Sequence, residues 1–203
     1  MSATTVRAFV GIALPEACRA LAARLGRRVA ALSRGPASPV REGTAHLTLT
    51  FLGDVPATGP GGIDAVAEAL AVITFAPFVL RFGGGGFFPD MARPRVVWAG
   101  LALGAPECRA LAARVDAALA PCGIAPQARP YRPHLTLARL REPGCGGDWP
   151  GALTLLTDAA WPETTVATMT LWRSLLSPSG ARHEVVATFR SEERRVGKEC
   201  RSR

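Results

Sequence analysis

One short sequence occurs twice in this chain of 203 residues. The first copy, HLTLTFLG, covers residues 46–53, and the second, HLTLAR, covers residues 134–139. Both copies are short and mix leucine with β-branched residues, and the first also contains an aromatic residue. Each copy therefore predicts a β-strand.

Alternate side chains of a strand point to the same face. In the first copy, this alternation groups His46, Thr48 and Thr50 on one face and Leu47, Leu49 and Phe51 on the other. In the second copy, it groups His134 with Thr136 and turns the leucines and Arg139 the other way. The leucine faces, with Phe51, belong in a core. The two polar faces indicate a cleft with a histidine on each wall.

A helix that precedes each motif extends the repeat. Residues 16–24 (EACRALAAR) recur almost unchanged as residues 107–114 (ECRALAAR). Each segment belongs to a predicted helix and is followed, after a loop, by its own histidine strand. Strand, helix and histidine strand therefore occur twice in the same order. Two related lobes that face each other across a pseudo-two-fold axis would bring the two histidines together.

The remaining elements follow from apolar periodicity and from turn residues. We expect helices at residues 16–32, 63–73 and 106–122, and further strands at residues 7–14, 77–82, 93–101, 166–174 and 183–190. The glycine run at residues 83–86 is not followed by the Gly-Lys-Ser/Thr of a phosphate-binding loop. We interpret it as a bend or bulge between strands.

The composition limits the class of protein. With 48% hydrophobic residues, the chain can bury a sizeable core as one domain or two small lobes. No apolar run is long enough to span a bilayer. The five cysteines are odd in number and lack CxxC spacing, which argues against a zinc site and against a disulfide framework. We therefore expect a cytoplasmic protein that does not associate with membranes.

The net charge of +8 and the end of the chain need separate consideration. A basic excess fits an anionic partner such as RNA, and it fits a solvated basic surface equally well. Residues 191–203 contain the only lysine, Lys198, and have no apolar periodicity. We interpret residues 1–190 as a single bilobal domain and residues 191–203 as a non-native or disordered tail.

The two motif histidines define the candidate chemistry. A histidine on a strand is more often structural than catalytic, but two of the only three histidines occupy matching points of a repeat. Two opposed imidazoles suit acid–base catalysis near neutral pH, and each threonine offers a hydroxyl to a phosphoryl oxygen. No carboxylate accompanies either motif, so no metal site is indicated. The pattern predicts a metal-free phosphoryl displacement in which one histidine activates water and the other protonates the leaving oxygen.

Several stretches of the sequence resemble one known family. They are RAFVGIALP (7–15), HLTLTFLG (46–53), RPRVVWAG (93–100), YRPHLTLAR (131–139) and LSPSGAR (176–182). A pair of His-x-Thr-x motifs is the signature of the two-histidine (2H) phosphoesterase superfamily. The whole set is similar to the bacterial and archaeal RNA 2′,3′-cyclic phosphodiesterases, which were first described as 2′-5′ RNA ligases. The resemblance covers roughly residues 5–190.

The resemblance implies a fold, a reaction and roles for four residues. The fold is α+β, with two pseudo-symmetric lobes, each an antiparallel sheet with outer helices, around a central cleft that carries both motifs. The reaction is hydrolysis of a terminal 2′,3′-cyclic phosphate of RNA to a 2′-phosphate, without a cofactor. By matching motif positions, His46 would be the proton donor and His134 the proton acceptor. Thr48 and Thr136 would hold the phosphate.

Substrate and assembly follow from the same resemblance. The substrates would be RNA with 2′,3′-cyclic phosphate ends or small cyclic nucleotides, and we expect a monomer. Arg132, Phe87 and Phe88 are further candidates for substrate binding, because Arg132 flanks the second motif and the two rings could stack on a base. Core packing is the alternative for at least one ring. His183 stands where the family usually has an aromatic residue, and we expect a strand surface residue there rather than a third catalyst.

Two other functions remain open. The same groups could join RNA ends through a 2′-5′ bond, since a 5′-hydroxyl can replace water as the attacking group. A non-catalytic RNA- or nucleotide-binding module, whose histidines only hold phosphate, belongs to a different class, and the intact motifs argue against it. Turnover separates the classes, because a binding module would leave a cyclic phosphate end intact.

Overall fold

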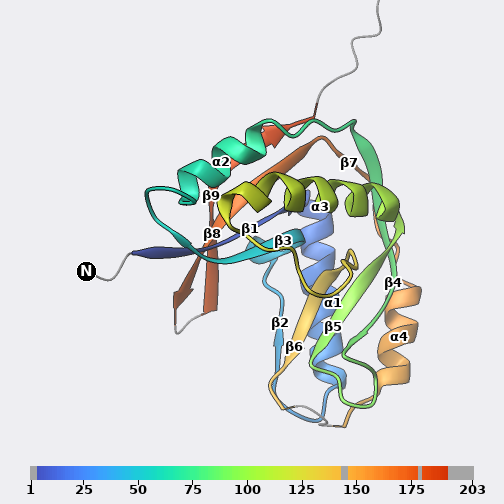
Figure 1. Ribbon diagram of the computed structural model, residues 1–203. Coiled ribbons are helices and arrows are strands. Elements are labelled where there is room, and N and C mark those ends of the chain that lie inside the picture. The colour runs from blue at the N-terminus through green and yellow to red at the C-terminus, as the bar shows by residue number, and fades with distance from the viewer. Residues whose placement is uncertain (1–3, 143–145, 178–179, 192–203) are drawn as a thin grey trace, which may run out of the picture.

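Two antiparallel sheets form the framework of the protein. The structure is a computed structural model that describes residues 4–142, 146–177 and 180–191 (Figure 1). The strand order is β3-β1-β8-β9 in the first sheet and β2-β6-β5-β4-β7 in the second. This arrangement confirms the predicted α+β fold with two sheets. The predicted tail lies outside the described residues, apart from Ser191.

Each sheet contains one of the two histidine motifs. The strands of the first sheet are β1 (Thr5–Ala13), β3 (His46–Pro56), β8 (Thr168–Ser177) and β9 (Gly180–Arg190). The strands of the second are β2 (Ala37–Pro39), β4 (Phe78–Phe88), β5 (Val96–Leu103), β6 (Leu135–Leu140) and β7 (Thr164–Val166). The segment expected as one strand at residues 166–174 therefore contributes to both sheets, with β7 in the second and β8 in the first.

Four helices and two short 3₁₀ turns complete the described fold. They are α1 (Glu16–Leu32), α2 (Ile63–Ala71), α3 (Ala105–Leu119) and α4 (Trp149–Thr157), with 3₁₀ turns at Glu42–Thr44 and Ala120–Cys122. Periodicity predicted the first three helices and not α4. The start of α4 has a recognisable signal, because the Asp148 side chain accepts a hydrogen bond from the Gly151 amide at 2.9 Å and Pro150 lies in the first turn.

The glycine run is part of β4 and makes room for neighbouring elements. A Cβ atom on Gly85 would lie 2.5 Å from the side chain of Leu156 in α4. A Cβ atom on Gly86 would lie 2.8 Å from the ring of Trp98, its partner across the sheet. The register between β4 and β5 is irregular from Phe82 to Gly85. The expected bulge is therefore present, but it lies within one long strand rather than between two strands.

The two lobes are tied together because each repeated helix packs on the other repeat's histidine strand. Helix α1 follows β1 of the first sheet in the chain but packs against β6 of the second (Figure 1). At this contact, Gly26 lies so close to the carbonyl of Leu137 that a Cβ atom would clash with it. Helix α3 packs against β3, where Asp116 accepts a hydrogen bond from Thr50 at 2.8 Å.

Both histidine strands contain a β-bulge directly after the threonine. Opposite β1, Thr48 and Thr50 pair with consecutive residues, so Leu49 is the extra residue of β3. Opposite β5, Thr136 and Ala138 do the same, so Leu137 is the extra residue of β6. A bulge of this kind puts two residues opposite one and reverses the alternation of side chains beyond it.

The bulges overturn three predictions that assumed regular strands. Thr50 was expected beside His46, but it is buried, with 2% of its surface exposed. Phe51 was expected in the core, but it is 51% exposed and lines the cleft. Arg139 was expected to point away from the cleft and lines it as well. Phe51 and Arg139 occupy equivalent places in the two motifs.

The bulge in β3 predicts opposite roles for two threonines of one strand. Thr50→Val should lower the free energy of unfolding by about 1–3 kcal/mol, because the Asp116 carboxylate loses its hydrogen-bond donor inside the fold. Thr48→Val, on the partly exposed cleft side, should change it by less than about 0.5 kcal/mol. Urea denaturation of both variants measures this difference, and equal losses would contradict the assignment of the bulge.

Candidate active site

A cleft between the two sheets brings the four predicted motif residues together. Its cavity has a volume of about 390 Å³ and is lined by His46, Thr48, His134 and Thr136. His46 is the first residue of β3, and His134 immediately precedes β6. The bulges follow the threonines, so each His-x-Thr pair keeps the regular alternation that places both side chains in the cleft.

Both histidines are held in the same way by the backbone. His46 Nδ1 lies 2.7 Å from the carbonyl oxygen of Thr44, and His134 Nδ1 lies 2.8 Å from the carbonyl oxygen of Arg132. A carbonyl oxygen can only accept, so each Nδ1 carries the proton and donates it. Each neutral ring therefore leaves Nε2 without a proton, ready to accept one.

Aromatic rings fix the plane of His46. Its ring is stacked on Phe9 of β1, with centroids 4.6 Å apart and an interplanar angle of 28°. His183 of β9 approaches edge-on at 5.1 Å and 86°, and Trp172 of β8 lies 5.8 Å away. The imidazole is therefore enclosed by rings from all three other strands of the first sheet, β1, β8 and β9.

Aromatic rings also surround His134 on the second wall. Trp98 of β5 lies 6.2 Å from His134. It pairs with Thr136 as Gly11 pairs with Thr48 in the first sheet, so the residue equivalent to Phe9 is Val96. Phe88 of β4 approaches His134 edge-on at 5.0 Å and 83°. Both histidines thus lie among aromatic rings, but His46 is stacked on one of them and His134 meets both of its rings edge-on.

Burial lowers the pKa of both motif histidines. For His46, burial is the main cause and brings the pKa to about 4; the hydrogen bond to Thr44 opposes it, and repulsion by His183, Arg139 and His134 adds to it. The pKa of His134 is lowered by burial, with repulsion by Arg139 and Arg132 as a smaller cause. In the empty cleft at neutral pH, both rings are therefore neutral.

Two arginines accompany the second motif in different ways. Arg139 lines the cleft and lies close enough to lower the pKa of both motif histidines. Arg132 lies instead against an aromatic pair, with its guanidinium carbon 5.9 Å from the centroid of Phe88 and 6.0 Å from that of Trp98. Arg132 is not part of the cleft lining. The sequence-based prediction therefore chose Arg132 as a substrate-binding candidate, although Arg139 is the arginine that lines the cleft.

The two candidate phenylalanines point to opposite faces of β4. Phe88 lines the cleft and is stacked on Trp98 at 5.0 Å. Phe87 points to the other side of β4, where 7% of its surface is exposed and its ring packs against Trp149 of α4. The prediction of a substrate-binding role is therefore wrong for Phe87, because alternation along β4 turns it into the core.

Two observations concern metals and membranes, and both are limited to the described residues. There, no group of three or more histidine, cysteine, aspartate or glutamate side chains could hold a metal ion. Within the same residues, no helix is both long and apolar enough to cross a membrane.

The amino-acid sequence of the chain matches a known family. Residues 19–176, most of the chain, match the 2′-5′ RNA ligase superfamily. The chain belongs to this superfamily. Among its relatives, an RNA 2′,3′-cyclic phosphodiesterase of Aeropyrum pernix is 33% identical over 148 residues, which are 71% of this chain and 81% of the relative. One of Thermus thermophilus is 33% identical over 189 residues, 91% of this chain and 89% of the relative.

Solved structures agree with this membership of the 2′-5′ RNA ligase superfamily. A crystal structure from Thermus thermophilus is 28% identical and covers 92% of this chain and 100% of its own, with a TM-score of 0.73. The crystal structure of Escherichia coli LigT complexed with 3′-AMP is 22% identical and covers 94% of this chain and 100% of its own, with a TM-score of 0.71. The second likeness concerns the fold alone.

Sequence reasoning missed residues that connect the two superfamily motifs. Tyr131, the only tyrosine, donates a hydrogen bond of 2.8 Å from its hydroxyl to the carbonyl oxygen of Thr48, in the opposite motif. Gln127 donates to the carbonyl oxygen of Phe51 at 3.0 Å. Both residues lie in the loop before the second motif. Burial raises the pKa of Tyr131, which keeps its hydroxyl protonated as a donor.

The lowered pKa values predict how the protein responds to acid. In the folded chain His46 should stay neutral until the pH falls to about 4, whereas a histidine of the unfolded chain takes up a proton near pH 6.5. Between these values the unfolded chain binds more protons, so stability should fall as the pH falls from 6.5 towards 4. NMR titration of the His46 ring and urea denaturation across this range test both statements. A His46 pKa near 6.5 would contradict them.

Proposed function

We propose that this protein hydrolyses the terminal 2′,3′-cyclic phosphate of RNA to a 2′-phosphate by acid–base catalysis with His46 and His134, without a metal ion. Membership of the superfamily supports a phosphoesterase role, and the names of the relatives support the cyclic substrate. One observation carries the proposal. Two histidines anchored through Nδ1 line one cleft from opposite sheets, each with Nε2 free to take or give a proton.

Each proton has a defined route in the proposed reaction. His134 Nε2 takes a proton from water as the water oxygen attacks phosphorus. The bond from phosphorus to the 3′ oxygen breaks, and His46 gives its Nε2 proton to that oxygen. The products are a 2′-phosphate and a free 3′-hydroxyl; His134 has gained one proton and His46 has lost one. Both lobes are needed, so residues 1–190 act as one bilobal unit.

The substrate phosphate would be held by groups of both motifs. The hydroxyls of Thr48 and Thr136 are hydrogen-bond donors on the two walls. Arg139 adds a positive charge on the side of His134, and a guanidinium is well suited to phosphoryl oxygens. The exposed ring of Phe51 and the ring of Phe88 are surfaces on which a base could stack.

His46 has to take up its proton when the substrate binds. A donor with a pKa of about 4 is almost entirely unprotonated in the empty cleft at neutral pH. The cyclic phosphate is an anion, and a nearby negative charge favours the protonated imidazole. The alkaline limb of kcat, which reports the complex, should therefore lie at higher pH than that of kcat/KM, which reports the free protein.

Removing either histidine should slow turnover without unfolding the protein. His46→Ala and His134→Ala should each reduce kcat by roughly 10²–10⁴-fold, and the double variant should lose much less than the product of both. His46→Ala should lose the alkaline limb of the pH–rate profile and His134→Ala the acid limb. The opposite pattern would exchange the two roles, and full activity of either variant would refute the mechanism.

An end-group assay separates the candidate reactions. An oligonucleotide with a 2′,3′-cyclic phosphate end and a cyclic mononucleotide are incubated with the protein in chelator, and the products are identified. We expect hydrolysis to a 2′-phosphate in both cases, at a rate that the chelator does not change. Activity that needs an added divalent ion would contradict the metal-free reaction. Joined oligonucleotides would indicate ligation, and an unchanged cyclic end would indicate a binding module.

A further inference from the structure

The third histidine of the chain, His183, belongs to the cleft. It lies on β9 opposite Ser174 of β8, and both residues line the cavity. Its ring approaches two rings edge-on, His46 at 5.1 Å and Phe9 at 4.9 Å. His183 therefore lies on a strand, as expected, but it is half-buried and faces the cleft.

His183 makes the same kind of edge-on contact with His46 that Phe88 makes with His134, although it comes from β9 and not from the strand equivalent to β4. The two edge-on contacts have nearly equal distances, 5.1 and 5.0 Å, and angles, 86° and 83°. Phe88 can offer only a π-face and an apolar edge, whereas an imidazole has two nitrogens that form hydrogen bonds. The ring that approaches His46 edge-on is therefore polar, and the ring that approaches His134 edge-on is apolar.

The hydrogen bonds of His183 differ from those of the other two histidines. Its Nδ1 is buried and has no hydrogen-bond partner within the described residues. Buried N–H groups without an acceptor are rarer in proteins than buried acceptors without a donor. The neutral ring therefore keeps its proton on Nε2, the opposite tautomer to the one that the backbone imposes on His46 and His134. Burial also lowers the pKa of His183, which favours the neutral ring.

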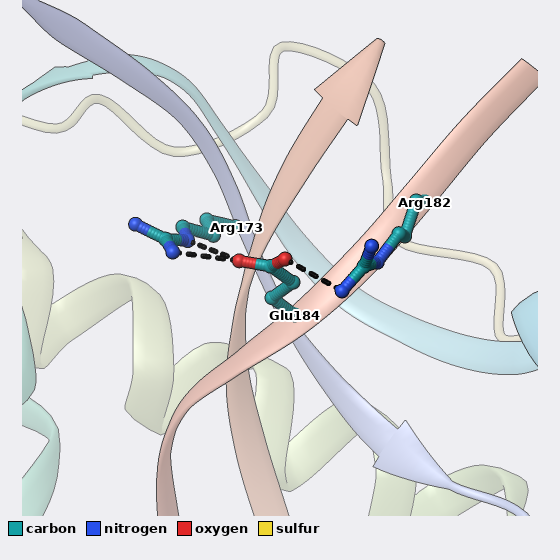
Figure 2. A network of polar contacts seen from close by, with 3 residues as sticks. All are labelled: Arg173, Arg182 and Glu184. Atoms are coloured by element: carbon teal, nitrogen blue, oxygen red, sulfur yellow. Dashed lines mark hydrogen bonds and ion pairs between the residues drawn. The ribbon is translucent and has the colours of Figure 1, made fainter. Parts of the chain in front are cut away.

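A charged network lies on the other side of the hairpin from His183. Glu184 accepts a hydrogen bond from Arg173 Nε at 2.8 Å and forms an ion pair with Arg173 Nη2 at 2.6 Å. It forms a second ion pair with Arg182 at 3.0 Å (Figure 2). Because side chains alternate along β9, these charges lie on the face opposite to His183. The cleft side instead presents Arg7 of β1, Arg139 of β6 and the two motif histidines.

We propose that His183 binds the substrate as a neutral hydrogen-bond donor, through Nε2–H, on the wall of His46. Its partner would be an oxygen of the bound nucleotide, either of the phosphate or of the sugar that carries it. In this arrangement, His46 handles the proton of the reaction while His183 holds the group beside it. The inference deepens the proposed function, because it uses the same site and the same class of substrate.

The tautomers can be read directly by NMR without any substrate. In ¹⁵N-labelled protein at pH 7.5, two-bond proton–nitrogen correlations distinguish a protonated Nδ1 from a protonated Nε2. His183→Phe assigns the His183 signals by their loss. We expect His183 to carry its proton on Nε2, and His46 and His134 to carry theirs on Nδ1. A proton on Nδ1 of His183, or on both of its nitrogens, would overturn the proposal.

Two matched substitutions test the donor in binding. His183→Gln keeps an amide N–H near the place of Nε2–H, and His183→Phe keeps a ring but has no donor. With adenosine 2′-monophosphate as the probe, calorimetry should show a 3- to 10-fold higher Kd for His183→Phe, the value of about one hydrogen bond. His183→Gln should stay within about threefold of the wild type by the same reasoning.

The outcomes separate this inference from the proposed reaction. Unchanged affinity of His183→Phe, equal losses in both variants, or no binding by the wild type would each overturn the inference. Donor-dependent binding in a protein that leaves cyclic phosphate ends intact would overturn the proposed reaction and leave the inference standing. A circular dichroism spectrum and a melting temperature like those of the wild type show that each variant is folded.

Discussion

One hydrogen bond to the backbone determines what each motif histidine can do. Nδ1 of His46 donates to Thr44 and Nδ1 of His134 donates to Arg132, in both cases to the carbonyl two residues earlier. The bond fixes the tautomer and the orientation of the ring, so Nε2 is the nitrogen left for chemistry. Because the cleft buries both rings and lowers their pKa values, the resting protein has two proton acceptors. An arriving anion would convert one of them into a donor.

The repeat makes the two walls alike, and single residues at equivalent positions make them different. The bulges at Leu49 and Leu137 turn the residue two places further on into the cleft, which is Phe51 on one wall and Arg139 on the other. Helices α1 and α3 each pack against the histidine strand of the other repeat and so connect the two walls. Gly26 of α1 contacts β6, and Asp116 of α3 contacts β3. At this one equivalent position the side of His46 presents an aromatic ring and the side of His134 presents a cation.

Alternation and repetition in the sequence predicted the two sheets and the four motif residues of the cleft. Local irregularities of the backbone prevented a correct prediction of the other residues that line it. The order of strand, helix and histidine strand predicted two related sheets and placed His46, Thr48, His134 and Thr136 in one cleft. A bulge is one extra residue without a signature in hydrophobic pattern, so Thr50, Phe51 and Arg139 were each assigned to the wrong face. The sequence could not show which of Phe87 and Phe88 faces the cleft, because the glycine run gave no sign that β4 continues through both residues. The role of His183 needed its tertiary neighbours.

The central claim is that both histidines act on one phosphate between the two walls. It is tested most directly by titrating inorganic phosphate into ¹⁵N-histidine-labelled protein and following the Nε2 resonances of His46 and His134. We predict that both resonances shift along curves with a single Kd, because one anion contacts both walls. Shifts of only one histidine, or two different Kd values, would show that the two rings do not share a phosphate and would contradict the account.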